Sequence, residues 1–262
     1  MALRICVLAS GSAANCIYVA SDQTRVLIDV GLSGRETERR LAEIGTDTRG
    51  IHAVCLTHEH SDHCAALRVL KKRHGLPVYA NSDTAKAVDR MESEMAGVEW
   101  NIFTTGVGFT VGDLHIEPFS VPHDAYDPVG FLVTCGHLRA GIVTDMGMVT
   151  TLIRERLRNC QAVVIETNHD PDMLSNAKRP WSLKQRIKGR QGHLSNQEAA
   201  DLVVEIAGPH LKSVFVAHLS RECNHPELAH KTVREALDKG GFQHVSVLLT
   251  YADRISEMVT ID

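Results

Sequence analysis

Four side chains that bind metal ions lie within six residues of one another, at His58, His60, Asp62 and His63. Imidazole and carboxylate groups are the ligands that zinc, manganese and iron accept in catalytic sites. His58 and His60 are two residues apart, so at the end of an extended strand their side chains point to the same side. Asp62 and His63 are adjacent and face differently, which suits a second metal ion. The spacing therefore predicts a metal-binding loop with room for two ions.

Three further candidate ligands follow apolar runs elsewhere in the chain. His123 comes after 120–122, at the end of the strand-like stretch 101–120, Asp145 comes after 142–144 and His218 after 214–217. Pro122 stiffens the approach to His123. Because all three lie where a predicted strand ends, as the loop at His58 does after the run 53–56, we expect them to complete one metal centre.

The elements that must position these residues alternate between strands and helices. Short branched runs bounded by turn residues predict the strands, and amphipathic runs predict the helices. The expected strands are 4–9, 16–20, 25–30, 51–56, 78–80, several within 101–120, the hairpin 131–144, 162–166, 213–217 and 244–249. The expected helices are 33–44, 62–74, 82–95, 149–158, 182–188, 195–206 and 226–238. Two strand-rich halves with helices predict a four-layer α/β sandwich, with two central mixed sheets and helices on the outer faces.

The composition is that of an ordinary globular protein. The chain has 262 residues, of which 44% are hydrophobic and 23% are charged, with a net charge of −4. No repeat or linker interrupts it, so we expect residues 1–262 to form one domain. No apolar run is long enough for a transmembrane helix, and the first apolar run is too short for a signal peptide. Seven scattered cysteines without a Cys-x-x-Cys pair are typical of a reducing compartment, so we expect a cytoplasmic protein without membrane partners.

Six motifs in this order resemble the YycJ/WalJ (VicX) family of metallo-β-lactamase-fold hydrolases. They are 8–16 (LASGSAANC), 57–63 (THEHSDH), 121–125 (VPHDA), 166–170 (ETNHD), 192–196 (GHLSN) and 217–220 (AHLS). The resemblance spans nearly the whole chain. One departure is Ala13-Ala14, where the family has a small residue followed by glycine, and this departure touches no candidate ligand.

The resemblance implies a dinuclear site within a metallo-β-lactamase-type sandwich. His58, His60 and His123 would bind one metal ion, and Asp62, His63 and His218 the other. Asp145 would bridge the two ions, and a hydroxide between them would be the nucleophile. In the superfamily an aspartate at Asp29 supports the metal loop, although the residues alone fit an ordinary strand-end turn equally well. The di-iron oxidoreductases of the superfamily have glutamate at the position of His60, so a redox role is disfavoured.

Two further histidines are candidates for catalysis. The segment at His193 resembles the Gly-His-Ser-Thr segment of tRNase Z, whose histidine is implicated in proton transfer, and an imidazole there could protonate a leaving oxygen. His193 could instead simply open the helix 195–206, for which Ser195 is the expected N-cap. His169 follows the strand 162–166 and could line the same cleft.

A basic segment lies just before His193. No acidic residue occurs between Asp172 and Glu198, whereas six lysines and arginines do, with Trp181 among them. Such a pattern suits phosphate contacts and base stacking. The alternative is a solvated helix face with Trp181 anchored in the core. The candidate substrate-binding residues are Lys178, Arg179, Trp181, Lys184 and Arg186.

The residues alone predict a dinuclear hydrolase of an anionic substrate. The resemblance implies a 5′-to-3′ DNA exonuclease with a role in DNA repair, in which Asp62, His193 and His169 take part in catalysis. The alternatives are a small-molecule hydrolase of a cyclic phosphodiester, thioester or lactam, and a regulatory protein with a relic metal site. The expected cofactors are two divalent ions, zinc, manganese or iron, and the expected partner is DNA. Residues 81–112 suit either a homodimer contact or a cleft wall.

Overall fold

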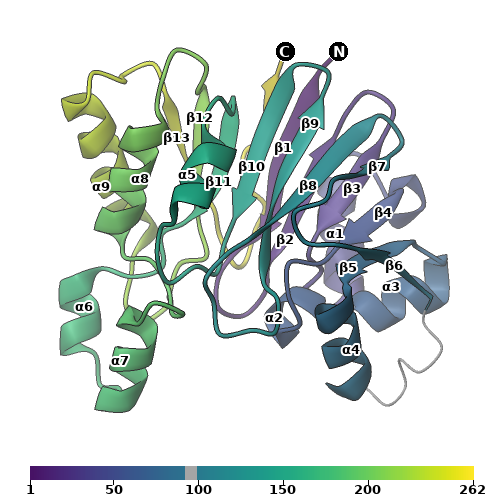
Figure 1. Cartoon of the computed structure of the whole chain (residues 1–262), viewed down its shortest axis with the longest axis horizontal. Helices are drawn as coiled ribbons and strands as arrows, with labels where there is room; N and C mark the ends of the chain where they lie inside the picture. The colour runs from purple at the N-terminus through teal and green to yellow at the C-terminus, as the bar shows by residue number, and fades with distance from the viewer. Residues whose placement is uncertain (92–98) are drawn as a thin grey trace.

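Two mixed sheets pack face to face in the computed structural model, which describes residues 1–91 and 99–262 (Figure 1). The first sheet has the strand order β14-β1-β2-β3-β4-β5-β6, and the second has β13-β12-β11-β10-β9-β8-β7. The strands of the first sheet are β1 (Leu3–Ala9), β2 (Cys16–Ala20), β3 (Arg25–Ile28), β4 (Ala53–Cys55), β5 (Val78–Asn81), β6 (Trp100–Phe103) and β14 (Val259–Ile261). Those of the second are β7 (Phe109–Val111), β8 (Leu114–Ser120), β9 (Val129–Cys135), β10 (Leu138–Val143), β11 (Ala162–Glu166), β12 (Ser213–Ala217) and β13 (Ser246–Leu249).

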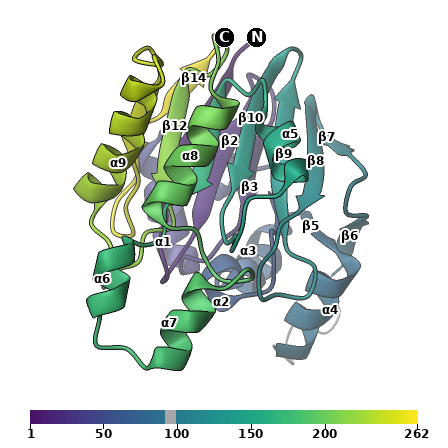
Figure 2. The same cartoon turned by 60° about the vertical axis from the view of Figure 1, so that its left-hand side comes forward.

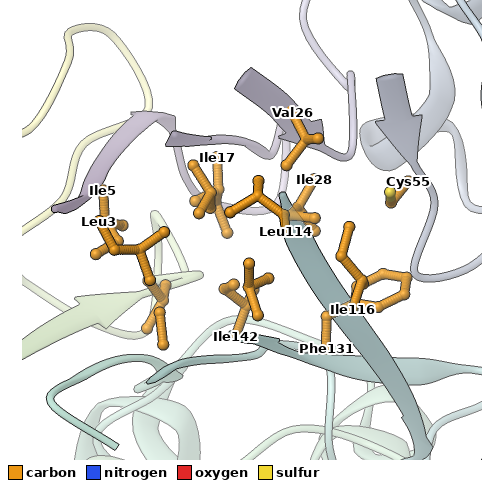
Figure 3. Close-up of a cluster of buried hydrophobic side chains, with 14 of the residues drawn as sticks. Leu3, Ile5, Ile17, Val26, Ile28, Cys55, Leu114, Ile116, Phe131 and Ile142 are labelled. Carbon is orange, nitrogen blue, oxygen red and sulfur yellow. The ribbon is translucent and has the colours of Figure 1, made fainter. Parts of the chain in front are cut away.

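The inner faces of the two sheets form one apolar core. Alternate residues of β1, β2 and β3, such as Ile5, Ile17 and Ile28, face Phe131 and Ile142 of the second sheet (Figure 3). Burying each such side chain stabilises the fold by about 1.5–3 kcal/mol. The two sheets therefore hold each other in place through period-two apolar patterns.

Helices cover the outer face of each sheet. On the first sheet, α1 (Gly34–Glu43), α3 (Leu67–His74) and α4 (Ser82–Met91) bury Leu41, Leu70 and Val88. On the second, α5 (Thr151–Leu157), α8 (Asn196–Ile206) and α9 (Pro226–Lys239) bury Ile153 and Val233 among others. The four-layer sandwich predicted from the sequence is confirmed.

Several predicted boundaries were wrong. The single helix expected over 62–74 is two helices, α2 (Ser61–Cys64) and α3, because the backbone N–H of Ala66 donates to the carbonyl of Val30 at 2.8 Å. The helix expected over 82–95 is α4, and the predicted positions 92–95 lie outside the described residues. The short α6 (Pro171–Asn176), the 3-10 turn Thr48–Gly50 and the strand β14 were not expected.

One pair of helices extends beyond the sandwich. The helices α6 and α7 (Trp181–Lys188) lie below the second sheet, at the end opposite the chain termini (Figures 1 and 2). The backbone of His193, just after α7, returns to that helix through an N–H bond to the carbonyl of Ile187 at 2.9 Å. The basic segment therefore stands beside the loops that leave the lower ends of the strands.

Two findings bear on the surroundings of the protein. Within residues 1–91 and 99–262, no helix combines the length and apolar character that crossing a bilayer requires. All seven cysteines are buried.

Candidate metal centre

The candidate ligands come together because parallel strands end at the same edge of each sheet. β10, β11 and β12 are parallel neighbours, so Asp145, Glu166 and His218 leave adjacent strand ends. β3 and β4 are parallel in the first sheet and deliver Asp29 and the loop that begins at Thr57. The carboxyl ends of parallel strands are where ligands bind in open α/β sheets.

Four overlapping groups of potential ligand atoms form at this edge, and Asp145 belongs to two of them, one with His58 and His63 and one with Glu166, His193 and His218. His58, His60 and His123 make a third group, and Asp62, His63 and His218 make the fourth, with the ligand atoms of each group within 4.8 Å of one another. Asp145 stands between them, with Oδ2 3.1 Å from Nε2 of His63 and Oδ1 3.2 Å from Nε2 of His218. The seven candidate ligands thus lie close together, and two of the four groups match the grouping that the family resemblance implied.

Buried atoms at this site fit divalent cations. Nε2 of His58 is buried without a hydrogen-bond partner among the described residues, whereas Nε2 of His123 and Oδ2 of Asp145 lie near Asp124 and His63. Nδ1 of His123 lies 3.1 Å from the carbonyl of Gly192, which fixes the ring and leaves Nε2 directed at the cluster. Buried polar atoms are normally paired, and imidazole nitrogens and a carboxylate that converge in this way fit a divalent cation as a shared partner.

Asp29 holds the metal loop, which confirms the supporting role left open by the sequence. Its carboxylate accepts hydrogen bonds at 2.8 Å from the backbone N–H and the hydroxyl of Thr57 and lies 2.8 Å from Nδ1 of His63. Asp29, Asp145 and His218 have φ values of 60°, 53° and 54°. Non-glycine residues in the left-handed region are uncommon and collect at functional sites, where the surrounding structure compensates for the strain.

Two contacting residues were missed by the sequence reasoning. Asn15 lies between the two halves, with Nδ2 3.2 Å from Oδ2 of Asp62 and Oδ1 3.1 Å from Nδ1 of His218. Glu166 is fully buried, and its Oε1 lies 2.6 Å from Nδ1 of His193. Both belong to the motifs quoted above, and the signal that could have found Glu166 is a carboxylate at the end of an otherwise apolar strand.

The buried charges of the centre support one another. Burial favours the neutral form of Asp145, but His218 and His63 outweigh it and hold the pKa of this carboxyl well below its usual range. Burial also acts to lower the pKa of His193, but the carboxylates of Glu166 and Asp145 raise it to about 9. Burial and the neighbouring imidazole of His63 keep the pKa of His58 well below its usual value.

A cleft of 320 Å³ opens beside the cluster. Its lining includes Ser12, Asn168 and His193 from the strand-end loops, together with Arg179 and Arg186 of the basic segment. Arg186 also forms an ion pair of 2.5 Å with Asp124, whose other oxygen lies 3.3 Å from Nε2 of His123. The basic segment is therefore joined directly to the metal centre.

The other predicted residues lie outside this cleft. Trp181 is 73% exposed, so the alternative of a core anchor is wrong. Lys178 is exposed, and Nζ of Lys184 donates to the carbonyl of Ser175 at 2.7 Å. His169 is buried behind the lining, where its backbone pairs with Ser195 and the neighbouring Asn168 takes the position in the cleft. Burial lowers the pKa of His169 to about 4, so its imidazole is neutral at neutral pH.

Fold and site together define the class of protein. Residues 24–218 match the model of the beta-lactamase superfamily domain, and the chain belongs to that superfamily. It is 36% identical over 242 residues to the exodeoxyribonuclease YycJ of Bacillus anthracis, with 92% of each chain covered. It is also 36% identical over 229 residues to the exodeoxyribonuclease WalJ of Streptococcus pneumoniae, with 87% of this chain and 85% of the relative covered.

The chain is thus a homologue of the YycJ/WalJ exodeoxyribonucleases and a metal-dependent hydrolase. Its fold also matches the crystal structure of the metallo-beta-lactamase fold protein YhfI from Bacillus subtilis, with a TM-score of 0.73, 15% identity and both chains fully covered. The fold predicted from the sequence is confirmed to be of the metallo-β-lactamase type.

Proposed function

We propose that residues 1–262 act as one domain that removes nucleotides from the ends of DNA, in the 5′-to-3′ direction, with two divalent ions of zinc or manganese. The observation that carries this proposal is the position of Asp145 between two groups of three ligands, beside a cleft with two arginines. The names of the relatives that are 36% identical support DNA as the substrate. A role in DNA repair is part of the same proposal.

The two groups of ligands would hold the two ions. His58, His60 and His123 supply three imidazoles, and Asp62, His63 and His218 supply a carboxylate and two imidazoles. The chemistry that two bound ions would supply is activation of water at neutral pH and neutralisation of charge on the phosphate. Asn15 and Asp29 orient Asp62, His63 and His218 from behind, as the outer partners of metal ligands do.

His193 is the group that we assign to proton transfer. Its Nδ1 lies 2.6 Å from Oε1 of Glu166, a contact that fixes the ring and leaves the opposite nitrogen, Nε2, for proton transfer. The side chain of His193 is 22% exposed and lines the cleft, where it can donate a proton to the oxygen that leaves the phosphate. We propose Glu166 as its positioning residue. His169 was also predicted to be catalytic, but it is buried and is not among the residues that line the cleft.

Arg179 and Arg186 are the residues that we assign to the DNA backbone. Both line the cleft, and their present partners are the carboxylates of Glu222 and Asp124. A phosphate can replace a carboxylate on the planar guanidinium fork. Trp181, exposed at the start of α7, is placed to stack on a base beyond the cleft, and Lys178 and Lys184 add positive charge around it.

The test is cleavage of single- and double-stranded DNA labelled at either end, by protein loaded with manganese or zinc. We expect stepwise loss of nucleotides from the 5′ end, and no cleavage by Asp62→Asn, which removes a ligand charge. Asp83→Asn, at an exposed position in α4, is the matched control and should cleave like the wild type. Metal-replete protein that leaves DNA and RNA intact would contradict the proposal and favour a small-molecule substrate.

A further inference from the structure

A second cavity, of 630 Å³, lies on the other side of Asp124 and Arg186 from the cleft that contains His193. Its wall is built from three segments that follow β8, β10 and α7. The lining residues are Pro122, Asp124, Met148, Arg186, Gly189, Arg190 and Gln191. A volume of this size falls within the range of about 300–1,000 Å³ that is usual for small-molecule sites.

The walls of this cavity are held against one another by backbone contacts. The N–H of Gly147 donates to the carbonyl of Pro122 at 2.8 Å. A Cβ on Gly147 would lie 2.4 Å from the backbone nitrogen of Gly192 and 2.5 Å from the backbone carbon of Arg190, which shows how closely these segments approach. The N–H of Gly192 also donates to the carbonyl of Gly189 at 2.8 Å. The cavity is therefore a formed feature of the fold.

The same three segments carry residues of the metal centre. Pro122 directly precedes His123, Met148 follows Asp145 by three residues, and Gln191 precedes His193 by two. The two cavities share the Asp124–Arg186 ion pair as a common wall. A molecule with a phosphate in the smaller cleft would pass Arg186 to reach the larger cavity.

The residues that line this cavity suit a nucleobase. Pro122 and Met148 supply apolar surfaces, and Gly189 contributes bare backbone, which suits the flat face of a base. Gln191 offers both a donor and an acceptor to a polar base edge. Arg190 is exposed, and no carboxylate pairs with it in the described part of the chain, so it is available to the phosphate of the same nucleotide.

We infer that this cavity, the base pocket, receives the base of the nucleotide next to the phosphate under attack. The inference rests on the proposed function and adds a subsite that recognises a nucleotide by its base as well as by its phosphate. The contacts to the base face are sequence-tolerant, because every base has an apolar face.

The test measures binding, so that it does not depend on cleavage. Calorimetry with manganese-loaded protein compares dAMP with 2-deoxyribose 5-phosphate, which has the same phosphate but no base. We expect dAMP to bind about tenfold more tightly, which corresponds to about 1.4 kcal/mol. Because both ligands carry the phosphate, metal contacts cancel and the ratio of the two affinities reports the base alone.

Variants at Met148 test whether the base binds in this cavity. Met148→Asp, which puts a negative charge into the apolar wall, should reduce the affinity ratio to about one, whereas Met148→Leu should retain it. Leu152→Asp is the matched control, because Leu152 is an exposed apolar residue in the nearby helix α5. It should bind both ligands as the wild type does. Circular dichroism and thermal melting establish that each variant is folded.

Two outcomes would overturn the inference. One is wild-type protein that binds dAMP no more tightly than 2-deoxyribose 5-phosphate. The other is a preference for dAMP that survives Met148→Asp in folded protein, because the base would then bind elsewhere. A protein that shows the Met148-dependent preference but cleaves no DNA would support the base pocket and contradict the proposed exonuclease.

Discussion

The carboxylate of Asp29 should determine the stability of the metal loop before any metal binds. It is 1% exposed and has three close contacts with two neighbours, the backbone and hydroxyl of Thr57 and the ring of His63. A hydrogen bond to a charged group contributes about 1.5–3 kcal/mol, and a buried donor left unpaired costs about 1–3 kcal/mol. Asp29→Ala leaves three buried partners without their acceptor, so at about 1–3 kcal/mol for each the expected loss in the free energy of unfolding is about 3–9 kcal/mol.

The substitution Asp29→Asn removes the charge of the side chain but keeps a residue that tolerates the same backbone conformation. Asparagine tolerates the left-handed φ of 60°, and its single carbonyl oxygen can still accept from Thr57. It cannot satisfy Thr57 and His63 together as a carboxylate does, so we expect a smaller loss of about 1.5–3 kcal/mol. Metal affinity should fall by about 10–100-fold, which is typical when the outer partner of a ligand is removed.

Urea unfolding of the metal-free variants, followed by circular dichroism, gives the free energies, and competition with a chelator gives the metal affinities. Asp253→Asn, at an exposed aspartate, serves as the control and should match the wild type. A folded Asp29→Ala variant that loses less than about 1 kcal/mol would refute the supporting role, since that is below the cost of even one unpaired buried donor.

We make three further predictions from the structure. The pKa of His169 is about 4 in the folded protein against an ordinary value of 6.5, so the unfolded chain binds more protons between these values and stability falls as the pH drops through that window. Between pH 7.5 and pH 5 this proton uptake lowers the free energy of unfolding by about 2 kcal/mol. His169→Gln should remove that part of the pH dependence, as measured by urea unfolding at the two pH values. Ser195 accepts from the N–H of Glu198 and donates to its carboxylate at 2.7 Å, so Ser195→Ala should lower stability by about 1 kcal/mol in thermal melts, and an unchanged midpoint would count against the cap. A Cβ on Gly31 would lie 1.6 Å from the carbonyl oxygen of Asp62, so Gly31→Ala should displace the metal loop and reduce bound metal by elemental analysis, whereas Gly208→Ala, where no atom lies within 4 Å, should bind metal normally.

Local sequence patterns were enough to predict the candidate metal ligands. The spacing of His58, His60, Asp62 and His63 is a property of seven consecutive residues, so no distant contact is needed to recognise it. His123, Asp145 and His218 were found because each follows an apolar run that forms a strand in the structure. Their convergence follows from strand ends that meet at one edge of each sheet.

Long-range contacts decided what the sequence could not show. The break between α2 and α3 depends on a hydrogen bond from Ala66 to Val30, which lies 36 positions earlier in the chain. Glu166 contacts His193 only because β11 ends beside the loop after α7. Trp181 is a large apolar residue for which burial is the default expectation, and its exposure follows from the projection of α7 away from both sheets (Figure 2).

The most direct test of a dinuclear centre is anomalous diffraction from crystals loaded with zinc or manganese, recorded on both sides of the absorption edge of the metal. We predict two peaks in each chain, one among His58, His60 and His123 and one among Asp62, His63 and His218, with Asp145 contacting both. A single peak, or two peaks away from Asp145, would contradict this prediction.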